Sequence, residues 1–332
     1  MSFLKALSGQ NLGPPPIWLM RQAGRYLPTY RALKQQRSLY DMFHDPQTIV
    51  TVTKLPFETL DLDAAILFSD ILTVLDGLGV PYTFQEQVGP VIEFQDFSLK
   101  KHAYQHIQEG IDLLKDQLSV PLIGFAGAPF TIASYLIEGR TTKNFLKAKR
   151  FLFEQPKKFE HLLQQVTEET CRYLDVQIQA GVDAIQIFDS WAHHVAYAEF
   201  TRFVLPYLDR VVQHVKARHC PVIIFSKATS LFAEELAALE PSAISADWNA
   251  DLAEVRQRIP PHIALQGNLD PAVLYGSKET IQQATDRILR AMAGNPGYIF
   301  NLGHGVLPDT PYENVKYLVD YVKHHTILPV SA

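Results

Sequence analysis

Short apolar runs recur along the chain, and each ends in polar or glycine residues. Near-continuous apolar runs of this length are typical of parallel strands, because helices cover both faces of such a sheet. The eight runs are 17–20, 64–68, 121–126, 184–188, 222–226, 243–247, 263–267 and 298–302. Helical patterns lie between several of them, at 157–180, 200–218, 231–239 and 280–293.

Eight strands alternating with helices predict an α/β protein with a single (β/α)8 TIM barrel. A chain of 332 residues can form such a barrel as one domain, here 1–332. The segment 80–97 interrupts the pattern, and its alternation around Val88-Gly89-Pro90 predicts a small β-hairpin inserted after the second strand. We find no internal repeat and no low-complexity tract.

In such a barrel the carboxyl ends of the strands form the functional face, so residues that follow the runs should converge at one rim. The residues in these positions are Arg21 and Arg25, Ser69 and Asp70, Gly127–Pro129, Asp189 and Ser190, Lys227, Asp247, Gly267–Asp270, and Gly303–Gly305.

Two arginines, Arg21 and Arg25, flank Gly24 in the stretch MRQAGRY directly after the first run. Either one alone could simply pair with an acidic neighbour on the surface. Together, at the end of a barrel strand, they predict an anion clamp, because the guanidinium fork matches a carboxylate with two hydrogen bonds. Glycine between them lets a ligand approach the backbone closely.

Asp70 stands between two apolar stretches, AAILFS and IL. It could cap the helix that follows. Alternatively it is a buried acid near the arginines, placed to accept hydrogen bonds or to stabilise a developing cation. The sequence leaves the direction of its pKa shift open, because desolvation would raise the pKa and the arginines would lower it.

Three further residues are candidates with weaker individual signals. His304 lies between two glycines at a strand end, which favours a ligand-facing role over a packed one. Tyr135 would lie early in a helix that begins at the rim, where a core position is the alternative. Ser190, in FDSWAHH, lacks the surroundings of a nucleophile elbow, so substrate hydrogen bonding is the better interpretation.

Composition narrows the class of protein. Hydrophobic residues make up 47% and charged residues 20%, as in soluble globular proteins. A net charge of −5 without a basic tract argues against nucleic acid as a partner. No apolar run is long enough to span a membrane, and the first residues do not resemble a signal peptide. Two cysteines, Cys171 and Cys220, fit a reducing cytoplasm.

The chain also lacks the usual cofactor motifs. No spaced Cys/His set, metalloprotease pattern or glycine-rich nucleotide loop occurs. We therefore expect neither a metal nor a nucleotide cofactor at the rim.

Six segments, in order along nearly the whole chain, resemble the uroporphyrinogen decarboxylase family of tetrapyrrole biosynthesis. They are PIWLMRQAGRYLPTYR, LDAAILFSDIL, GFAGAPFTIASYLIEG, IQIFDSWA, QGNLDP and IFNLGHGVLPDTP. The resemblance implies a (β/α)8 barrel that forms homodimers. It also implies a cofactor-free decarboxylation of the four acetate arms of uroporphyrinogen III, giving coproporphyrinogen III. The serine of IQIFDSWA stands where some members carry threonine, which preserves the hydroxyl.

The resemblance also implies roles for individual residues. Asp70 would bind the pyrrole N–H groups and stabilise the protonated ring, and Arg21 is the favoured proton donor, with Tyr135 or a water relay as alternatives. The remaining contacts to the tetrapyrrole and its acid arms would come from Arg21, Gln22, Ala23, Gly24, Arg25, Tyr135, Ser190 and His304.

Two other functions stay open from the sequence. The same barrel resembles zinc-dependent corrinoid or thiol methyltransferases, which need a thiol on the carboxyl-end rim. Cys171 lies in a predicted helix and Cys220 precedes a strand, so neither is well placed. A non-catalytic tetrapyrrole-binding protein is the second alternative.

Overall fold

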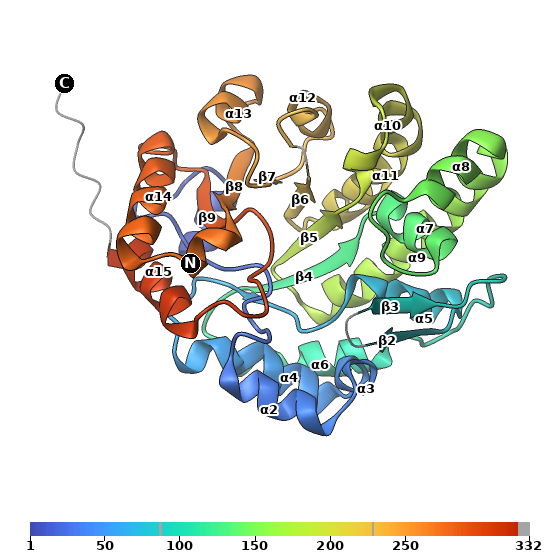
Figure 1. Ribbon diagram of the computed structural model, residues 1–332, viewed down its shortest axis with the longest axis horizontal. Helices are drawn as coiled ribbons and strands as arrows, with labels where there is room; N and C mark the ends of the chain where they lie inside the picture. The colour runs from blue at the N-terminus through green and yellow to red at the C-terminus, as the bar shows by residue number, and fades with distance from the viewer. Residues whose placement is uncertain (86–87, 228, 325–332) are drawn as a thin grey trace.

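The computed structural model describes residues 1–85, 88–227 and 229–324. Seven strands form one parallel sheet, in the order β1-β4-β5-β6-β7-β8-β9. Helices surround this sheet (Figure 1). The strands are β1 (Ala65–Ile66), β4 (Leu122–Gly127), β5 (Ala184–Asp189), β6 (Val222–Ser226), β7 (Ala243–Ala246), β8 (Ala264–Leu269) and β9 (Tyr298–Leu302).

The segment after Pro16 closes the sheet into a barrel. Ile17 forms a parallel bridge with Phe300 of β9, and the Phe300 N–H donates to the Pro16 carbonyl at 2.8 Å. On its other side, the Asp63 N–H donates to the Ile17 carbonyl at 2.8 Å, just before β1. This extended segment is the eighth wall element, so the predicted (β/α)8 barrel is confirmed.

The predicted hairpin follows the second wall element. Strands β2 (Tyr82–Gln85) and β3 (Gly89–Ile92) pair antiparallel, with Tyr82 opposite Ile92. Residues 86–87, at the predicted turn, lie outside the described residues. The hairpin is confirmed.

Most helices surround the strands, whereas the first helix packs Phe3, Ala6 and Leu7 into the apolar cluster inside the barrel. The α-helices are α1 (Ser2–Leu7), α2 (Pro28–Gln36), α3 (Leu39–His44), α4 (Pro46–Lys54), α5 (Val74–Leu78), α6 (Gln105–Leu114), α7 (Pro129–Glu138), α8 (Leu146–Glu154), α9 (Pro156–Ala180), α10 (Tyr197–Phe203), α11 (Leu205–Lys216), α12 (Ala233–Ala237), α13 (Leu252–Arg258), α14 (Lys278–Ala291) and α15 (Tyr312–His324). The 3-10 turns are η1 (Leu55–Glu58), η2 (Ile71–Thr73), η3 (Ala192–His194) and η4 (Pro271–Tyr275). Among the helices described, none has the length and apolar character needed to cross a membrane.

One predicted helix is divided. The sequence pattern predicts a single helix over 200–218, whereas the structure has α10 and α11, separated at Val204. Pro206 lies in the first turn of α11. Proline has no N–H to donate, so it is tolerated at a helix start but interrupts a helix interior.

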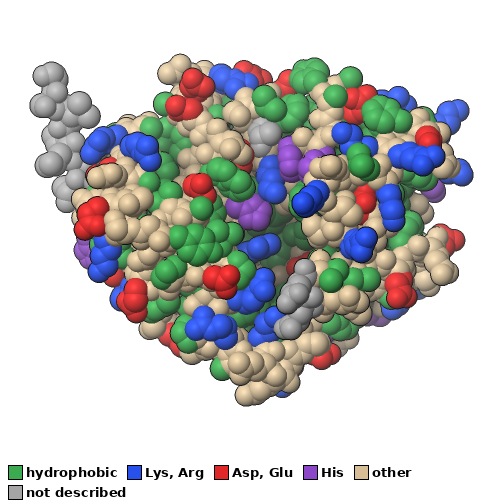
Figure 2. Space-filling view, in the orientation of Figure 1, with side chains coloured by type: hydrophobic (Ala, Val, Ile, Leu, Met, Phe, Trp, Pro, Cys, Tyr) green, Lys and Arg blue, Asp and Glu red, His purple; other side chains and the backbone are tan. Residues whose placement is uncertain are grey.

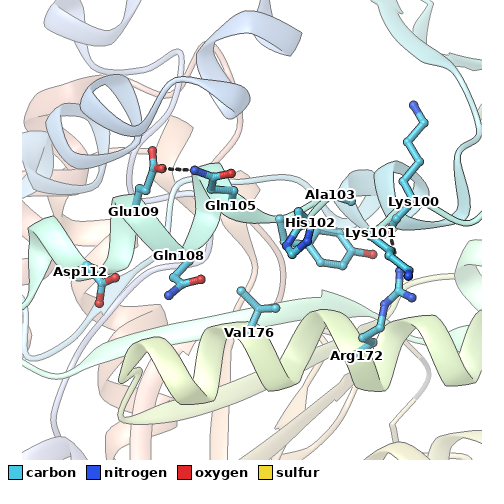
Figure 3. Close-up of a pocket in the computed structure, with 11 residues that line it drawn as sticks. Lys100, Lys101, His102, Ala103, Gln105, Gln108, Glu109, Asp112, Arg172 and Val176 are labelled. Atoms are coloured by element: carbon cyan, nitrogen blue, oxygen red, sulfur yellow. Dashed lines mark hydrogen bonds between the residues drawn. The ribbon is translucent and has the colours of Figure 1, made fainter.

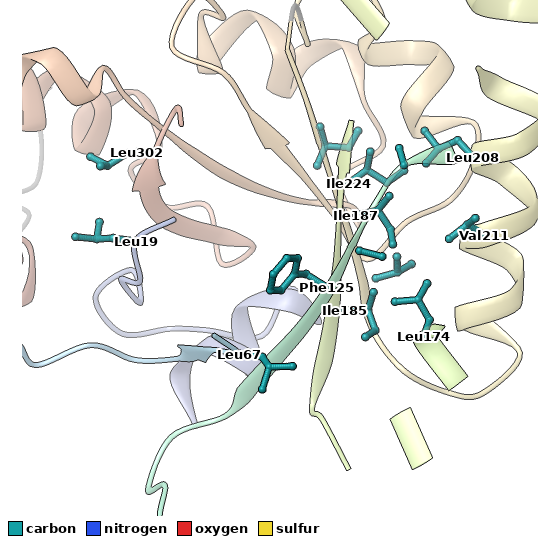
Figure 4. Close-up of a cluster of buried hydrophobic side chains, with 14 of the residues drawn as sticks. Leu19, Leu67, Phe125, Leu174, Ile185, Ile187, Leu208, Val211, Ile224 and Leu302 are labelled. Atoms are coloured by element: carbon teal, nitrogen blue, oxygen red, sulfur yellow. The ribbon is translucent and has the colours of Figure 1, made fainter. Parts of the chain in front are cut away.

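Successive side chains of a strand point alternately into the barrel and toward the surrounding helices, and they form two apolar clusters. Ile223 and Phe225 of β6 belong to the cluster inside the barrel, with Trp18 and Phe3. The intervening residues face the helices. Figure 4 shows this outer layer, in which Ile185, Ile187 and Ile224 lie against Leu174 of α9 and Leu208 and Val211 of α11. Burial on both faces explains why the strands read as near-continuous apolar runs.

The barrel interior also contains a polar chain. The Trp18 Nε1–H donates to Gln266 Oε1 at 2.8 Å. The Gln266 amide in turn donates to Gln186 Oε1 at 3.0 Å and to Ser245 Oγ at 2.8 Å. These bonds satisfy buried polar groups and tie the closing segment to strands across the barrel.

We predict that Asp63→Ala weakens barrel closure. Asp63 Oδ2 accepts the Ile17 N–H at 2.8 Å, while Oδ1 accepts from Ser2 Oγ and Lys323 Nζ, each at 3.0 Å. Loss of these bonds should lower the free energy of unfolding by about 2 kcal/mol in denaturant titrations. Asp61→Ala is the control, because Asp61 is 72% exposed and pairs with the same lysine at 3.4 Å. Equal effects of the two substitutions would contradict the prediction.

Candidate active site

The turn after the closing segment presents Arg21 above the barrel. The Met20 N–H donates to Asn301 Oδ1 at 3.0 Å, and the Met20 carbonyl accepts the Val306 N–H at 2.9 Å. Arg21 itself has a φ of 60°, in the left-handed region that side chains rarely adopt. Such conformations concentrate at functional sites, where surrounding bonds enforce them.

Gly305 makes room for the Arg21 side chain. A Cβ at Gly305 would lie 2.4 Å from Arg21 Cδ and 2.6 Å from Cγ. Gly305, which follows His304 in the loop after β9, therefore leaves the space that the Arg21 side chain occupies.

The buried side chain of Gln22 stabilises the turn that carries Arg21. It is 1% exposed and connects the closing segment to the residue before β1. It accepts from the Leu19 N–H at 3.2 Å and donates to the Ala64 carbonyl at 3.2 Å. The Gln22 N–H donates to Leu19, and its carbonyl accepts the Tyr26 hydroxyl at 2.6 Å. These groups are engaged within the protein, so Gln22 positions its neighbours; direct ligand contact by Gln22 stays a prediction.

Ala23, Gly24 and Arg25 complete the loop. Ala23 packs against the core, and a Cβ at Gly24 would lie only 3.0 Å from the Arg21 carbonyl. The Arg25 side chain is exposed, while its carbonyl accepts from Arg31 Nη1 at 2.9 Å. The loop thus holds two exposed guanidinium groups on a backbone that is bonded at several points.

Asp70 lies beyond the end of β1 and caps η2. Its Oδ1 accepts the Leu72 N–H at 2.9 Å, so the capping interpretation of the sequence is confirmed. Burial raises the pKa of Asp70, and the Leu72 N–H and Arg21 lower it in part. Desolvation therefore decides the direction of the shift. Capping and interaction with Arg21 are compatible, because the carboxylate has a second oxygen.

His304 reaches the same rim from the loop after β9. Its ring is edge-on to Phe225 and Trp248, with centroids 5.9 and 6.0 Å away. Burial, together with Arg21 and Lys227, lowers the pKa of His304 to about 3. The imidazole is therefore neutral at physiological pH and offers one donor and one acceptor.

Tyr135 projects from α7 toward these groups. Burial raises the pKa of Tyr135, and the charge of Asp70 raises it further. The Thr141 hydroxyl, 3.5 Å from the Tyr135 hydroxyl, and the charge of Arg21 lower it. Its ring is edge-on to Trp191 at 5.9 Å. Ser190 directly precedes Trp191 at the end of β5 and is half-buried.

Two further residues lie at the rim: Lys227, which the sequence analysis placed there without a role, and Tyr30, which it did not assign. Lys227 follows β6 and lies over the Trp191 ring, with Nζ 4.7 Å from the centroid. Burial lowers the pKa of Lys227, and Arg21 lowers it further. Its place after a strand was the available signal. Tyr30 of α2 interacts with Arg25, Asp70 and Arg21, and burial is the main cause of its pKa of about 12. Tyr30 follows no predicted strand, and its only signal was its place in the segment PIWLMRQAGRYLPTYR.

Five predicted site residues are therefore linked by electrostatic interactions at one rim, namely Arg21, Arg25, Asp70, Tyr135 and His304. Figure 2 shows a hollow near the middle of the visible face, with lysine, arginine and histidine side chains around it. Such a concentration of cations in a protein of net charge −5 favours an anionic ligand.

A separate cavity of about 540 Å³ lies outside the strands, between α6 and α9 (Figure 3). It is lined by Lys100–Gln105, Gln108, Glu109, Asp112, Arg172 and Val176. Its lysine, arginine and carboxylate side chains are mixed, and none of its lining residues follows a barrel strand. We therefore place the active site at the rim.

Residues 1–325 match the sequence model of the family described as uroporphyrinogen decarboxylase (URO-D). The uroporphyrinogen decarboxylase of Protochlamydia amoebophila is 44% identical over 330 residues, covering 96% of this chain and 90% of that protein. The chain belongs to the uroporphyrinogen decarboxylase family. A relative of the same name from Geobacillus thermodenitrificans is 42% identical over 336 residues, covering 98% and 97% of the two chains. The resemblance drawn from the six segments is confirmed.

A solved structure supports the fold of this uroporphyrinogen decarboxylase family member. A methyltransferase from Methanosarcina mazei superposes with a TM-score of 0.82 and 19% identity, covering 97% of each chain. At that identity the likeness concerns the fold alone.

We predict a pH-dependent effect of Asp189→Asn. Asp189 is fully buried at the end of β5. Thr131 donates to one carboxylate oxygen at 3.0 Å, and the other makes no hydrogen bond of normal geometry to the described residues, although the nearby Ala192 N–H lowers the pKa in part. Burial raises the Asp189 pKa to about 7, against about 3.9 in an unfolded chain. The folded state thus holds an extra proton, and this stabilisation is full below about pH 4 and is lost as the pH rises to about 7.

Asn cannot lose that proton. We compare the free energy of unfolding of the original protein with that of Asp189→Asn at each pH. Between about pH 4 and about pH 7, the original protein should lose stability relative to the variant by about 1.4 kcal/mol per pH unit, a few kcal/mol in all. Denaturant titrations at several pH values provide the measurement. Asp61→Asn is the control for the same change of side chain at an exposed position. Parallel pH profiles for the protein and Asp189→Asn would show that Asp189 does not titrate in this way.

Proposed function

We propose that this protein removes the four acetate carboxyl groups of uroporphyrinogen III as CO₂, giving coproporphyrinogen III, without a cofactor. The pyrrole ring serves as the electron sink. Protonation of the ring gives a cation, the C–C bond to the carboxylate breaks, and its electron pair neutralises that cation. A proton then adds to the methylene carbon and the ring proton leaves, so each acetate consumes one proton and becomes a methyl group. The interaction of Arg21 with Asp70, Tyr135 and His304 at one rim carries this proposal.

The arginine loop would bind the acid arms. A substrate with many carboxylates needs several converging donors, and Arg21 and Arg25 provide two forks from one bonded turn. The backbone at Gln22, Ala23 and Gly24 would lie along the macrocycle. Lys227 adds a third cation next to Arg21.

Asp70 would stabilise the cationic pyrrole. Burial raises its pKa, which means that the carboxylate is poorly solvated in the free protein. A poorly solvated carboxylate is stabilised most strongly when pyrrole N–H donors and a ring cation bind beside it. Stabilisation that grows toward the transition state is the kind that accelerates a reaction.

Tyr135, Ser190 and His304 would hold the remaining polar groups of the tetrapyrrole. Burial raises the pKa of Tyr135, so its hydroxyl stays protonated and can donate. His304 is neutral, so it can donate to a carboxylate without adding a further full charge. The Ser190 hydroxyl can either donate or accept.

Arg21 is the proposed proton donor, because its charge acts on both Asp70 and His304. Arginine rarely gives up a proton, so a water relay or Tyr135 are the alternatives. We also propose that the whole chain acts as one catalytic domain, as a homodimer and in the cytoplasm. Size-exclusion chromatography with light scattering tests the dimer.

A zinc-dependent methyltransferase is the competing enzyme class. It requires a thiol at the carboxyl ends of the strands. Cys171 lies within α9, and Cys220 precedes β6 at the opposite strand end. Burial raises their pKa values, to about 11 and about 12, so neither forms a thiolate ligand readily. These positions favour the decarboxylase.

The deciding experiment is anaerobic incubation of the purified protein with uroporphyrinogen III under metal-free conditions. Products are separated by their number of carboxyl groups. Loss of four carboxyls supports the proposal. Tight binding without loss of any carboxyl would instead indicate a non-catalytic tetrapyrrole-binding protein.

We predict that Asp70→Asn lowers kcat by roughly 100-fold to 1,000-fold, the usual effect of removing one electrostatic stabiliser. The amide keeps an oxygen that can accept the Leu72 N–H, so the cap on η2 should survive. Product formation under saturating substrate gives kcat, and thermal unfolding shows whether the fold is intact. Near-normal turnover would refute the counter-charge role.

We predict that Arg25→Lys raises the substrate Kd by roughly tenfold to 100-fold, because one charge remains but the paired donors are lost. Thermal stability should change little, since the side chain is exposed. Arg150→Lys is the matched control, because Arg150 is 77% exposed on α8 and forms its ion pair with Glu154 of the same helix. If both variants bind the substrate like the original protein, Arg25 is not part of the clamp.

A further inference from the structure

Two histidines and a carboxylate converge away from the barrel rim. His44 is the last residue of α3, Asp76 lies in α5, and His106 lies in α6. One ligand atom from each lies within 4.8 Å of the other two. The three side chains therefore come from helices that are far apart in sequence and meet only in the folded chain.

The hydrogen bonds of His44 require a cation in this cluster. His44 Nδ1 lies 2.7 Å from the Tyr40 carbonyl, which can only accept, so Nδ1 carries the hydrogen. His44 Nε2 then carries the lone pair of the ring, and this nitrogen lies 2.9 Å from Asp76 Oδ2. A lone pair and a carboxylate repel each other unless a proton or a metal ion lies between them.

His106 distinguishes a metal ion from a proton. Its Nε2 is buried and has no hydrogen-bond partner among the described residues. Its ring is 4.5 Å from that of His44, centroid to centroid. A proton shared by His44 and Asp76 would leave this buried nitrogen unsatisfied, whereas a metal ion would use it as a third ligand.

We propose that His44, Asp76 and His106 form a binding site for a divalent transition-metal ion such as Zn²⁺. Two imidazoles and one carboxylate are a common donor set for this ion, and water would complete the coordination. The Nδ1–H bond to Tyr40 is the outer contact that typically orients a metal-bound histidine. In a tetrahedral site with bonds of about 2.0–2.1 Å, ligand atoms lie roughly 3.3 Å apart. His44 Nε2 and Asp76 Oδ2, now 2.9 Å apart, would therefore separate slightly, while the ligand atom of His106, which lies within 4.8 Å of both, would move toward them.

Such an ion would be structural. Helix α5, which carries Asp76, continues directly from η2, the turn that Asp70 caps. A metal ion would tie this segment to α3 and α6. The site lies partly open, since the His44 and Asp76 side chains are 21% and 12% exposed, so an ion can enter without unfolding.

The test uses the full chain after treatment with EDTA. The protein is equilibrated with Zn²⁺, desalted and analysed for bound metal, and Co²⁺ absorption spectra report the coordination. We expect one ion per chain and a higher Tm with Zn²⁺ than with EDTA. His106→Gln should bind Zn²⁺ at least about 100-fold more weakly and lose the rise in Tm.

His262→Gln is the matched control. His262 also pairs with a carboxylate, Glu240, at 2.8 Å, but it is exposed and belongs to no such cluster within residues 1–85, 88–227 and 229–324. This variant should bind metal as the original protein does. Should His106→Gln fail to fold in EDTA, Asp76→Asn replaces it, with the same expectation. Either absence of stoichiometric metal in the original protein or unchanged affinity in these variants would overturn the proposal.

Discussion

Closure of the barrel by the segment Ile17–Met20 is the constraint on which the site depends. The segment lies between β9 and β1 and bonds to both, through Phe300 and Asp63. Because the chain leaves this wall at the rim, the next residue is Arg21. The side chains of Gln22 and Asn301 then hold the turn in place. The contacts that close the barrel therefore also place Arg21 at the rim.

Burial controls the electrostatics at that rim. It raises the pKa of Asp70 and lowers the pKa values of His304 and Lys227. Each shift disfavours the charged form of its group, and Arg21 acts on all three. In the proposed function, an anionic tetrapyrrole would reduce the repulsion between Arg21 and Lys227, and its N–H groups would donate to Asp70. A ligand that brings both carboxylates and N–H donors, as we propose, would offset these shifts.

The strands were predictable because parallel strands in a barrel are buried on both faces and read as short apolar runs. The division between α10 and α11 was missed because a 3.6-residue period continues across Pro206, and only the missing N–H interrupts the helix. The sequence could place Arg21, Asp70 and His304 at the rim because they follow strands, and their roles there stay predictions. The place of Tyr30 at the rim was not predicted, because it comes from α2 and follows no strand.

By itself, the sequence determined the barrel and the family, because apolar periodicity and ordered motifs are local properties of the chain. The tertiary structure decided the direction of each pKa shift, since desolvation depends on neighbours distant in sequence. It also showed that Gln22 is turned inward, and it brought His44, Asp76 and His106 together. Those three residues lie on separate helices, and no spacing along the chain could have indicated that they meet.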